Sequence, residues 1–357
     1  MSFTIMTYLF ASKIKYFTFV VMKLLRYIAF PLVPFYYLAT WSRNKLYDFG
    51  MKSSTSFDIP VICVGNLSVG GTGKTPMIEY LIRLLKNNYK VATLSRGYKR
   101  KTNGFVVADK STDVSDIGDE PFQFFKKFKD IIVGVDTNRR NGIEQILALD
   151  KKPDVILLDD GFQHRRVKAG FNILLTPYNN LYSRDIVLPT GNLREPISGA
   201  KRADVIVVTK CPDQLSEMEK QKVIQSLNPK YGQHIFFSSI AYSEKIRNSF
   251  EERNLQDLKK EEFTLVTGIA NAKPLISFLD SKDLKFEHLD FKDHHEYSEK
   301  EIEQLKNKKL IVTTEKDFMR LGAHFKTSNT IFYLPIETEI VDFKTFDNLI
   351  AKFVRNS

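Results

Sequence analysis

Short apolar runs alternate with amphipathic stretches along most of the chain from Ile59 onward. Each run is nearly continuous in Val, Ile and Leu and ends at turn residues, which is typical of a β-strand buried on both faces of a parallel sheet. The amphipathic stretches between them supply the crossover helices that parallel strands require. The predicted strands of this group are 61–64, 91–95, 131–135, 155–158, 173–175 and 205–208.

A second group of strands and polar helices follows residue 210, and it has fewer polar clusters at its strand ends. Its strands are predicted near 235–239, 263–268, 286–290, 310–313 and 331–334. This alternation indicates a second, smaller α/β domain. The last stretch, 343–354, has the apolar spacing of an amphipathic helix that packs on a domain.

Before these domains lies an apolar, aromatic stretch at 14–42, which is interrupted by Lys15, Lys23 and Arg26 and then by two prolines. Its longest charge-free run, 27–42, has 16 residues, fewer than the roughly 20 that a spanning helix needs. We predict an interfacial segment whose basic side chains meet anionic headgroups. A buried core helix and a single membrane span are the alternatives. Because Met22 is also a natural start, residues 1–21 form a hypothetical upstream extension.

Length, charge and cysteine content narrow the class of protein. A chain of 357 residues has room for two α/β domains. The first 100 residues hold 14 Lys/Arg against three Asp/Glu, which accounts for the whole net charge of +11. A basic N-terminal part favours acidic partners: a nucleotide, an anionic lipid surface or a nucleic acid. The only two cysteines, Cys63 and Cys211, indicate a reducing compartment and no disulfide framework.

The strand predicted at 61–64 leads into a glycine-rich loop that opens a helix at 77–85. This strand–loop–helix order is the context of a phosphate-binding loop, in which backbone N–H groups and the helix dipole face a polyphosphate. Lys74 is predicted to reach the β- and γ-phosphates and Thr75 to ligate magnesium. The first glycine of the generic motif is replaced by Ser68. The predicted nucleotide-binding residues are Ser68, Gly70, Gly71, Thr72, Gly73, Lys74 and Thr75.

Polar residues follow several other predicted strands, at the edge where ligands bind in parallel sheets. The strand at 155–158 ends in Asp159 and Asp160, which predicts a magnesium-binding carboxylate. N-capping and turn formation are the alternatives for this pair. The basic loop 95–101, the acidic helix entry 118–121 and the irregular loop 191–196 are each compatible with binding or with a structural role alone.

Taken in order, these motifs resemble one family, the tetraacyldisaccharide 4′-kinases, over nearly the whole chain after residue 22. Ser68 matches the loop of that family. The resemblance implies ATP- and magnesium-dependent phosphorylation of the 4′-hydroxyl of an acylated disaccharide 1-phosphate in lipid A biosynthesis, at the cytoplasmic face of the bacterial inner membrane. The motifs that carry it are Ser68–Thr75, Ser95–Tyr98, Gly118–Pro121, Leu158–His164, Gly191–Pro196, Asp293–His294 and Thr314–Asp317.

The resemblance also implies roles for single residues. Asp119 and His294 map onto a catalytic pair in which His294 orients Asp119, the base for the sugar hydroxyl, with Lys74 as the third catalytic residue. Asp159 and Asp160 map onto the magnesium region. Two further pairs are assigned to ligands: Arg194 and Glu195 to the nucleotide, and Arg96 and Arg139 to the substrate phosphate.

The expected fold is a P-loop NTPase-like parallel sheet with helices on both faces, followed by a second α/β domain. The expected division is an N-terminal membrane-associated segment at 1–48, a P-loop kinase domain at 49–209, and a domain at 210–357 that closes over the nucleotide. The expected partners are the lipid substrate and an anionic membrane surface, with no nucleic acid and no protein partner.

Two other functions remain open at this point. A P-loop GTPase or ATPase switch protein would carry a guanine-reading Asn/Thr-Lys-x-Asp element, and the stretch 209–213 has one residue too many for it. A nucleic-acid-binding ATPase would spread its basic residues along a groove with stacking aromatic side chains. Here the basic residues near the N-terminus interrupt a hydrophobic run instead.

Overall fold

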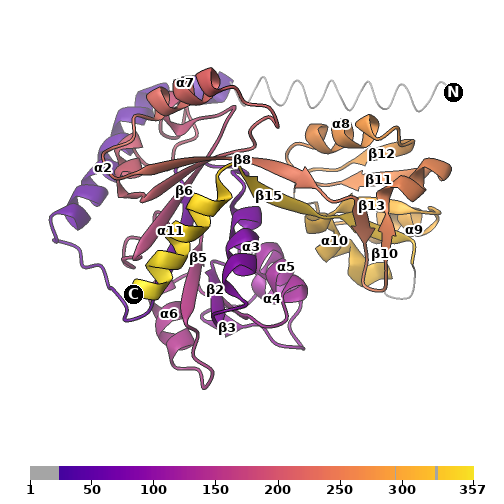
Figure 1. Cartoon of the computed structure of the whole chain (residues 1–357), viewed down its shortest axis with the longest axis horizontal. Coiled ribbons are helices and arrows are strands. Elements are labelled where there is room, and N and C mark those ends of the chain that lie inside the picture. Colours follow the sequence, from indigo (N-terminus) through magenta and orange to yellow (C-terminus); the bar gives the residue numbers. More distant parts are fainter. Residues whose placement is uncertain (1–23, 294, 326–328) are drawn as a thin grey trace.

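The computed structural model describes residues 24–293, 295–325 and 329–357. Two β-sheets organise this part of the chain, and they lie side by side along the long axis of the molecule (Figure 1). Both sheets contain parallel strands with helices packed on them, so the α/β fold predicted from the hydrophobic pattern is confirmed.

The larger sheet has nine strands in the order β15-β8-β7-β6-β1-β5-β2-β4-β3. Its central strands are parallel, and its two edge strands, β15 and β3, pair antiparallel with their neighbours. Val64 of β1 pairs with Asp159, the last residue of β5, and β1 continues beyond this pair to Asn66. The strands are β1 (Val61–Asn66), β2 (Val91–Ser95), β3 (Val106–Val107), β4 (Ile132–Val135), β5 (Val155–Asp159), β6 (Phe171–Pro177), β7 (Val205–Thr209), β8 (His234–Tyr242) and β15 (Ile336–Ile340).

Helices cover both faces of this sheet, because alternate residues of its strands point to opposite cores. Ile62 and Val64 of β1 join the core formed with α3, α5 and α11. Val61 and Cys63 join the opposite core, which includes residues of α6 and α7. The helices on this sheet are α3 (Lys74–Leu85), α4 (Val114–Ile117), α5 (Asp119–Lys127), α6 (Arg139–Leu147), α7 (Glu217–Leu227) and α11 (Phe343–Asn356), with the 3₁₀ helices η2 (Tyr182–Arg184) and η3 (Ile197–Arg202).

The smaller sheet has six strands in the order β10-β9-β14-β13-β11-β12. Its core is separate from the two cores of the larger sheet. The strands are β9 (Lys245–Arg247), β10 (Glu252–Asn254), β11 (Phe263–Thr267), β12 (Phe286–Asp290), β13 (Ile311–Thr314) and β14 (Ile331–Leu334). The helices are α8 (Lys273–Ser281), α9 (Glu299–Lys306), α10 (Glu315–Leu321), η4 (Leu255–Lys260) and η5 (Gly322–Phe325).

The sheets divide the chain differently from the expected boundary at residue 210. Strand β8 belongs to the larger sheet, and after the smaller sheet the chain returns to it through β15, whose register with β8 runs from Ile336 to Ile340. Helix α11 then lies across the larger sheet (Figure 1) and buries Phe346, Ile350 and Val354 in its core. The second domain is therefore an insertion between β8 and β15, and the C-terminal helix packs on the first domain.

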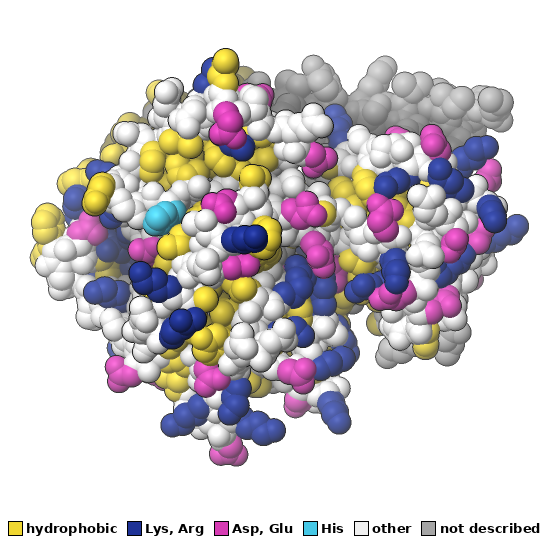
Figure 2. Space-filling view, viewed as in Figure 1, with side chains coloured by type: hydrophobic (Ala, Val, Ile, Leu, Met, Phe, Trp, Pro, Cys, Tyr) yellow, Lys and Arg dark blue, Asp and Glu magenta, His cyan; other side chains and the backbone are white. Residues whose placement is uncertain are grey.

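The N-terminal segment continues from residue 24 through η1 (Phe30–Leu32) into α2 (Val33–Asp48). Val33 and Tyr36 pack on a core of the larger sheet. The outer side of the segment leaves large apolar side chains in solvent, among them Phe35, which is 73% exposed, and Leu38, which is 58% exposed. Hydrophobic side chains are visible along this edge of the molecule (Figure 2). Within residues 24–293, 295–325 and 329–357, no helix has the length and hydropathy needed to cross a membrane. The hypothetical extension at 1–21 lies outside the described residues.

Candidate active site

The loop between β1 and α3 has the geometry predicted for phosphate binding. Gly70 and Gly73 adopt left-handed backbone conformations with φ of 108° and 91°, which favour glycine. Helix α3 then begins at Lys74, so that its unpaired N–H groups face the loop. Thr72 is buried, and its hydroxyl accepts a hydrogen bond of 2.8 Å from the Asn66 amide.

The end of β7 holds this loop from the other side. The Thr209 hydroxyl donates to the Thr72 carbonyl oxygen at 2.8 Å, and the Lys210 ammonium donates to the Gly71 carbonyl oxygen at 2.6 Å. These contacts use the same stretch, 209–213, that approaches a guanine-reading element in sequence. In this structure the stretch supports the phosphate-binding loop.

Asp159 and Asp160 follow each other at the end of β5, but their environments differ. Asp159 is buried, and burial raises the pKa of its carboxyl to about 6 against the opposing charge of Lys74. Asp160 has a left-handed backbone with φ of 51°. Burial opposes its ionisation, yet hydrogen bonds from Arg194 and the charge of Lys74 outweigh this and hold the pKa of Asp160 below its usual range. The Lys74 ammonium lies 3.6 Å from Oδ1 of Asp160.

The residues at this point fit a magnesium ion. Oδ2 of Asp159 accepts a hydrogen bond from the Ser95 hydroxyl at 3.2 Å, whereas Oδ1 is buried without a hydrogen-bond partner. A buried acceptor of this kind needs a donor or a cation. Magnesium is usually held by one or two carboxylates together with phosphate oxygens and water.

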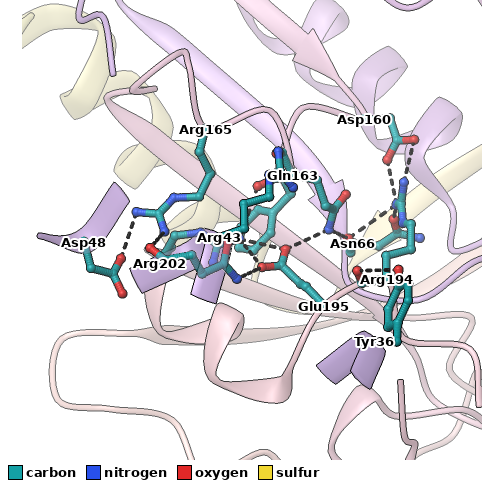
Figure 3. A network of polar contacts seen from close by, with 12 residues as sticks. Tyr36, Arg43, Asp48, Asn66, Asp160, Gln163, Arg165, Arg194, Glu195 and Arg202 are labelled. Carbon is teal, nitrogen blue, oxygen red and sulfur yellow. Dashed lines mark hydrogen bonds and ion pairs between the residues drawn. The ribbon is translucent and has the colours of Figure 1, made fainter. Parts of the chain in front are cut away.

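Arg194 and Glu195 are neighbours in sequence, but their side chains have different partners (Figure 3). The Arg194 guanidinium binds both oxygens of Asp160, at 2.8 and 3.0 Å, and also contacts Asn66 at the end of β1. It therefore lies at the phosphate-binding loop. The Glu195 carboxylate is buried, and it accepts hydrogen bonds from Asn44, Gln163 and Arg202. A contact between Glu195 and a nucleotide stays a prediction.

Asp119 lies at the start of α5, where the two domains meet. Its carboxylate forms a double ion pair with the guanidinium of Arg320 from α10, including a bond of 3.2 Å from Nε to Oδ1. The interaction joins residues 201 positions apart and brings the second domain to this carboxylate. His294 lies outside the described residues, so its pairing with Asp119 stays a prediction.

Arg139 lies at the end of β5, where its guanidinium donates to the Asp159 carbonyl oxygen at 3.4 Å, and Arg96 is close enough for its charge to act on Arg139. Arg96 is exposed after β2, while Arg139 is buried at the start of α6 and donates to the Asp136 carbonyl oxygen at 2.7 Å. Burial lowers the pKa of Arg139 to about 10 in spite of the nearby Asp159. Arg139 also lines a cavity of about 370 Å³ between α2 and α6. Most side chains of its lining are cationic: Arg43, Lys52, Arg139, Arg140, Arg165 and Arg166. Tyr47, Thr137, Asn138 and His164 complete the lining, and burial together with the charge of Arg139 lowers the pKa of His164 to about 4, so that it is neutral.

Comparison with known proteins agrees with this geometry. The family model described as tetraacyldisaccharide-1-P 4′-kinase matches residues 25–355. The chain belongs to this family. It is 51% identical to the tetraacyldisaccharide 4′-kinase of Flavobacterium johnsoniae over 94% of this chain and 99% of that protein. It is 44% identical to the enzyme of the same name from Bacteroides fragilis, over 88% of this chain and 89% of that protein.

A solved structure supports the same assignment. It is described as the "apo" form of LpxK from Aquifex aeolicus in complex with ATP, with a TM-score of 0.74 and 31% identity over 92% of this chain and 99% of that one. As a 4′-kinase family member, the chain is a phosphotransferase with an alcohol acceptor, and the resemblance seen in its motifs is confirmed. The switch-protein alternative is not favoured.

Sequence reasoning missed several residues that build the site of this family member. Arg320, Asn66 and Lys210 were given no role, although each contacts a predicted site residue or the loop. Arg320 lies three positions after the Thr314–Asp317 motif, and that spacing on a helix was an available signal. Nothing in the sequence indicated that Gln163 would link the β1 end to Glu195, since this contact depends on the folded loops.

Proposed function

We propose that this chain transfers the γ-phosphoryl group of ATP to the 4′-hydroxyl of a tetraacyldisaccharide 1-phosphate at the cytoplasmic face of the inner membrane. The observation that carries the proposal is the group of charges at the phosphate-binding loop, where Lys74 and Arg194 both contact Asp160 beside the buried Asp159. Phosphoryl transfer depends mainly on positioning and on stabilisation of charge, and this group supplies both.

In this proposal Lys74 and the loop N–H groups bind the β- and γ-phosphates. Arg194, from the 191–196 segment, contacts Asn66 at the end of β1 and adds a second positive charge beside this loop. Asp159, with its unpartnered buried oxygen, and the Thr75 hydroxyl would hold magnesium, which neutralises phosphate charge when bound. Asp160 keeps Lys74 and Arg194 at the loop before the nucleotide arrives.

Asp119 is the proposed base for the acceptor hydroxyl, with His294 as the residue that orients it. Its place at the junction of the two domains supports this role, because a sugar bound between the domains would meet it. The ion pair with Arg320 fixes the direction of the carboxylate. Both oxygens are held in one plane by the guanidinium, so little rearrangement is needed when the hydroxyl approaches.

The membrane and the lipid headgroup are assigned to the α2 side of the molecule. Exposed Phe35 and Leu38 would enter the boundary of an anionic bilayer, while Arg43 and Lys52, which line the cavity beside α2, would contact the headgroups. The basic cavity beside α2, which includes Arg139, has the charge and size to take a phosphate of the lipid substrate. This arrangement would present the disaccharide to the strand ends while its acyl chains stay in the membrane.

The experiment is phosphorylation of a tetraacyldisaccharide 1-phosphate in detergent micelles with ATP and magnesium. We expect transfer by the wild type and a loss of kcat of about 10²–10⁴-fold in Asp119→Ala. Asp130→Ala, an exposed carboxylate three residues after α5, is the matched control. Bound ATP without any transfer would overturn the kinase assignment, whereas equal rates in wild type and Asp119→Ala would remove only the proposed base.

A further inference from the structure

Helix α2 carries exposed apolar side chains on one side and polar contacts to the active site on the other. On its inner side the Tyr36 hydroxyl donates to the carbonyl oxygen of Arg194 at 3.0 Å. Two turns later the Asn44 amide donates to Oε2 of Glu195 at 2.6 Å. The helix therefore contacts both residues of the Arg194–Glu195 pair (Figure 3).

The contacts continue from this pair to the phosphate-binding loop without a break. Oε1 of Glu195 accepts from the Gln163 amide at 2.9 Å, and the same amide donates to the Asn66 carbonyl oxygen at 2.8 Å, where β1 ends. The guanidinium of Arg194 binds Asp160, which in turn lies 3.6 Å from Lys74. Arg202 adds hydrogen bonds of 2.8 and 3.0 Å to the two Glu195 oxygens.

Burial makes the hydrogen bonds of Glu195 costly to lose. The residue is 3% exposed, so water cannot readily replace a donor that moves away from its carboxylate. One of these donors, Asn44, belongs to α2, and Arg165 holds the same turn of the helix through the Asn44 carbonyl oxygen at 2.7 Å. A shift of α2 would thus remove a donor from a buried carboxylate whose backbone neighbour is Arg194.

We propose that Tyr36 and Asn44 are positioning residues that couple the membrane-facing helix α2 to the nucleotide site, acting through Glu195 and Arg194. Docking of α2 sets how Arg194 holds Asp160 at the phosphate-binding loop. The inference rests on the proposed placement of ATP at that loop. Coupling of this kind is reciprocal, so bound ATP must also hold α2 more firmly in place.

The test measures ATP affinity of the full chain in detergent micelles, with magnesium and without any lipid substrate. A helix that served only as an anchor would leave this affinity unchanged. We expect Asn44→Ala to raise the Kd for ATP by about 5-fold or more. Tyr36→Phe should raise it less, because it removes a neutral hydrogen bond and leaves the fold intact. The matched control is Tyr37→Phe, which removes a hydroxyl from the next position of α2, where the side chain is 45% exposed.

Hydrogen exchange of the α2 amides gives the reciprocal readout. In the wild type and in Tyr37→Phe, ATP should slow exchange across residues 33–48, and in Asn44→Ala this effect should be lost. The coupling would be overturned if Tyr36→Phe and Tyr37→Phe bound ATP with equal affinity and if ATP did not change hydrogen exchange in α2. The same comparison tests the coupling if Asn44→Ala does not fold. If the wild type itself failed to bind ATP, the proposed nucleotide site would be wrong and the inference would fall with it.

Discussion

Lys127 is the cation of a buried charge cluster that joins three helices from the two domains. Its ammonium lies 2.7 Å from Oε2 of Glu79 on α3 and 2.9 Å from the carboxylate of Glu315 on α10. Glu79 also accepts a hydrogen bond of 2.8 Å from the Gln123 amide, and the Arg83 guanidinium lies 3.5 Å from the Glu79 carboxylate. The side chains of Glu79 and Glu315 are 2% and 4% exposed, and that of Lys127 is 16% exposed.

Replacing Lys127 with Met should destabilise the protein strongly. At pH 8, above the pKa of about 7 to which burial and Glu79 raise Glu315, the substitution leaves two buried carboxylates facing each other with only the more distant Arg83 as a cation. Removing one partner of a buried ion pair costs about 3–5 kcal/mol. In a protein of this size that corresponds to a fall in Tm of roughly 4–7 °C. The control is Lys126→Met, at the preceding position of α5. The Lys126 side chain is exposed, and its ammonium lies 4.8 Å from the centre of the Phe122 ring.

Thermal unfolding of four proteins tests this reasoning: the wild type, Lys127→Met, Glu315→Gln and the double variant. The double variant should regain part of the loss, because it no longer places two negative charges in one buried site. A coupling of this sign in the double-mutant cycle shows that charge, rather than packing of the lysine stem, is responsible. The reasoning is refuted if Lys127→Met and Lys126→Met have the same Tm. It is also refuted if the destabilisation of the double variant equals the sum of the effects of Lys127→Met and Glu315→Gln.

Three further predictions concern Glu315, Arg320 and Phe35. Burial, and then the neighbouring carboxylate of Glu79, raise the pKa of Glu315 to about 7 from an ordinary 4.5. The contribution of Glu315 to stability is therefore present below pH 4.5 and is lost as the pH rises through 7. Between pH 5 and pH 8 the Tm of Glu315→Gln should accordingly rise relative to that of the wild type. Arg320→Met frees the Asp119 carboxylate and should lower kcat about 10-fold or more while changing KM for ATP less, as steady-state kinetics would show. Phe35→Ser should weaken sedimentation with anionic lipid vesicles, whereas Tyr231→Ser, at a side chain that is more exposed than Phe35 but lies on a loop of the first domain, should not. Equal binding by both variants would contradict a membrane role for α2.

The strands of the larger sheet were predictable because burial on both faces demands continuous apolar runs. All six strands predicted between 61 and 208 are present, and Asp159 follows directly on four apolar residues of β5. The phosphate-binding loop was equally predictable, since its glycines, lysine and following helix are consecutive in sequence. Strand β3, with only two residues, was missed because such a short run carries no pattern.

Strand β15 was missed for a different reason. Its sequence alternates Ile or Thr with Glu, which suits an edge strand with one face in solvent, but the prediction was based on continuous apolar runs. Since β15 pairs with β8, 94 or more positions away, its return to the larger sheet is a long-range event. The insertion of the second domain, the Arg320–Asp119 ion pair and the Glu195 contacts all depend on such distant pairings. No local pattern indicates them.

The parts of the site also differ in whether local structure or long-range contacts hold them. Lys74, Asp159 and Asp160 stand at the ends of strands or at a helix start within the larger sheet, so the sheet alone fixes their spacing. Arg194 and Asp119 stand on connecting segments, and each is held by charged or polar contacts from another part of the chain: α2 in the first case and α10 in the second. Groups held in this way depend on how α2 and α10 are docked, whereas the backbone positions of Lys74 and Asp159 depend on the larger sheet alone. We therefore expect variants in α2 or α10 to change the position of Arg194 or Asp119 before they change that of Lys74 or Asp159.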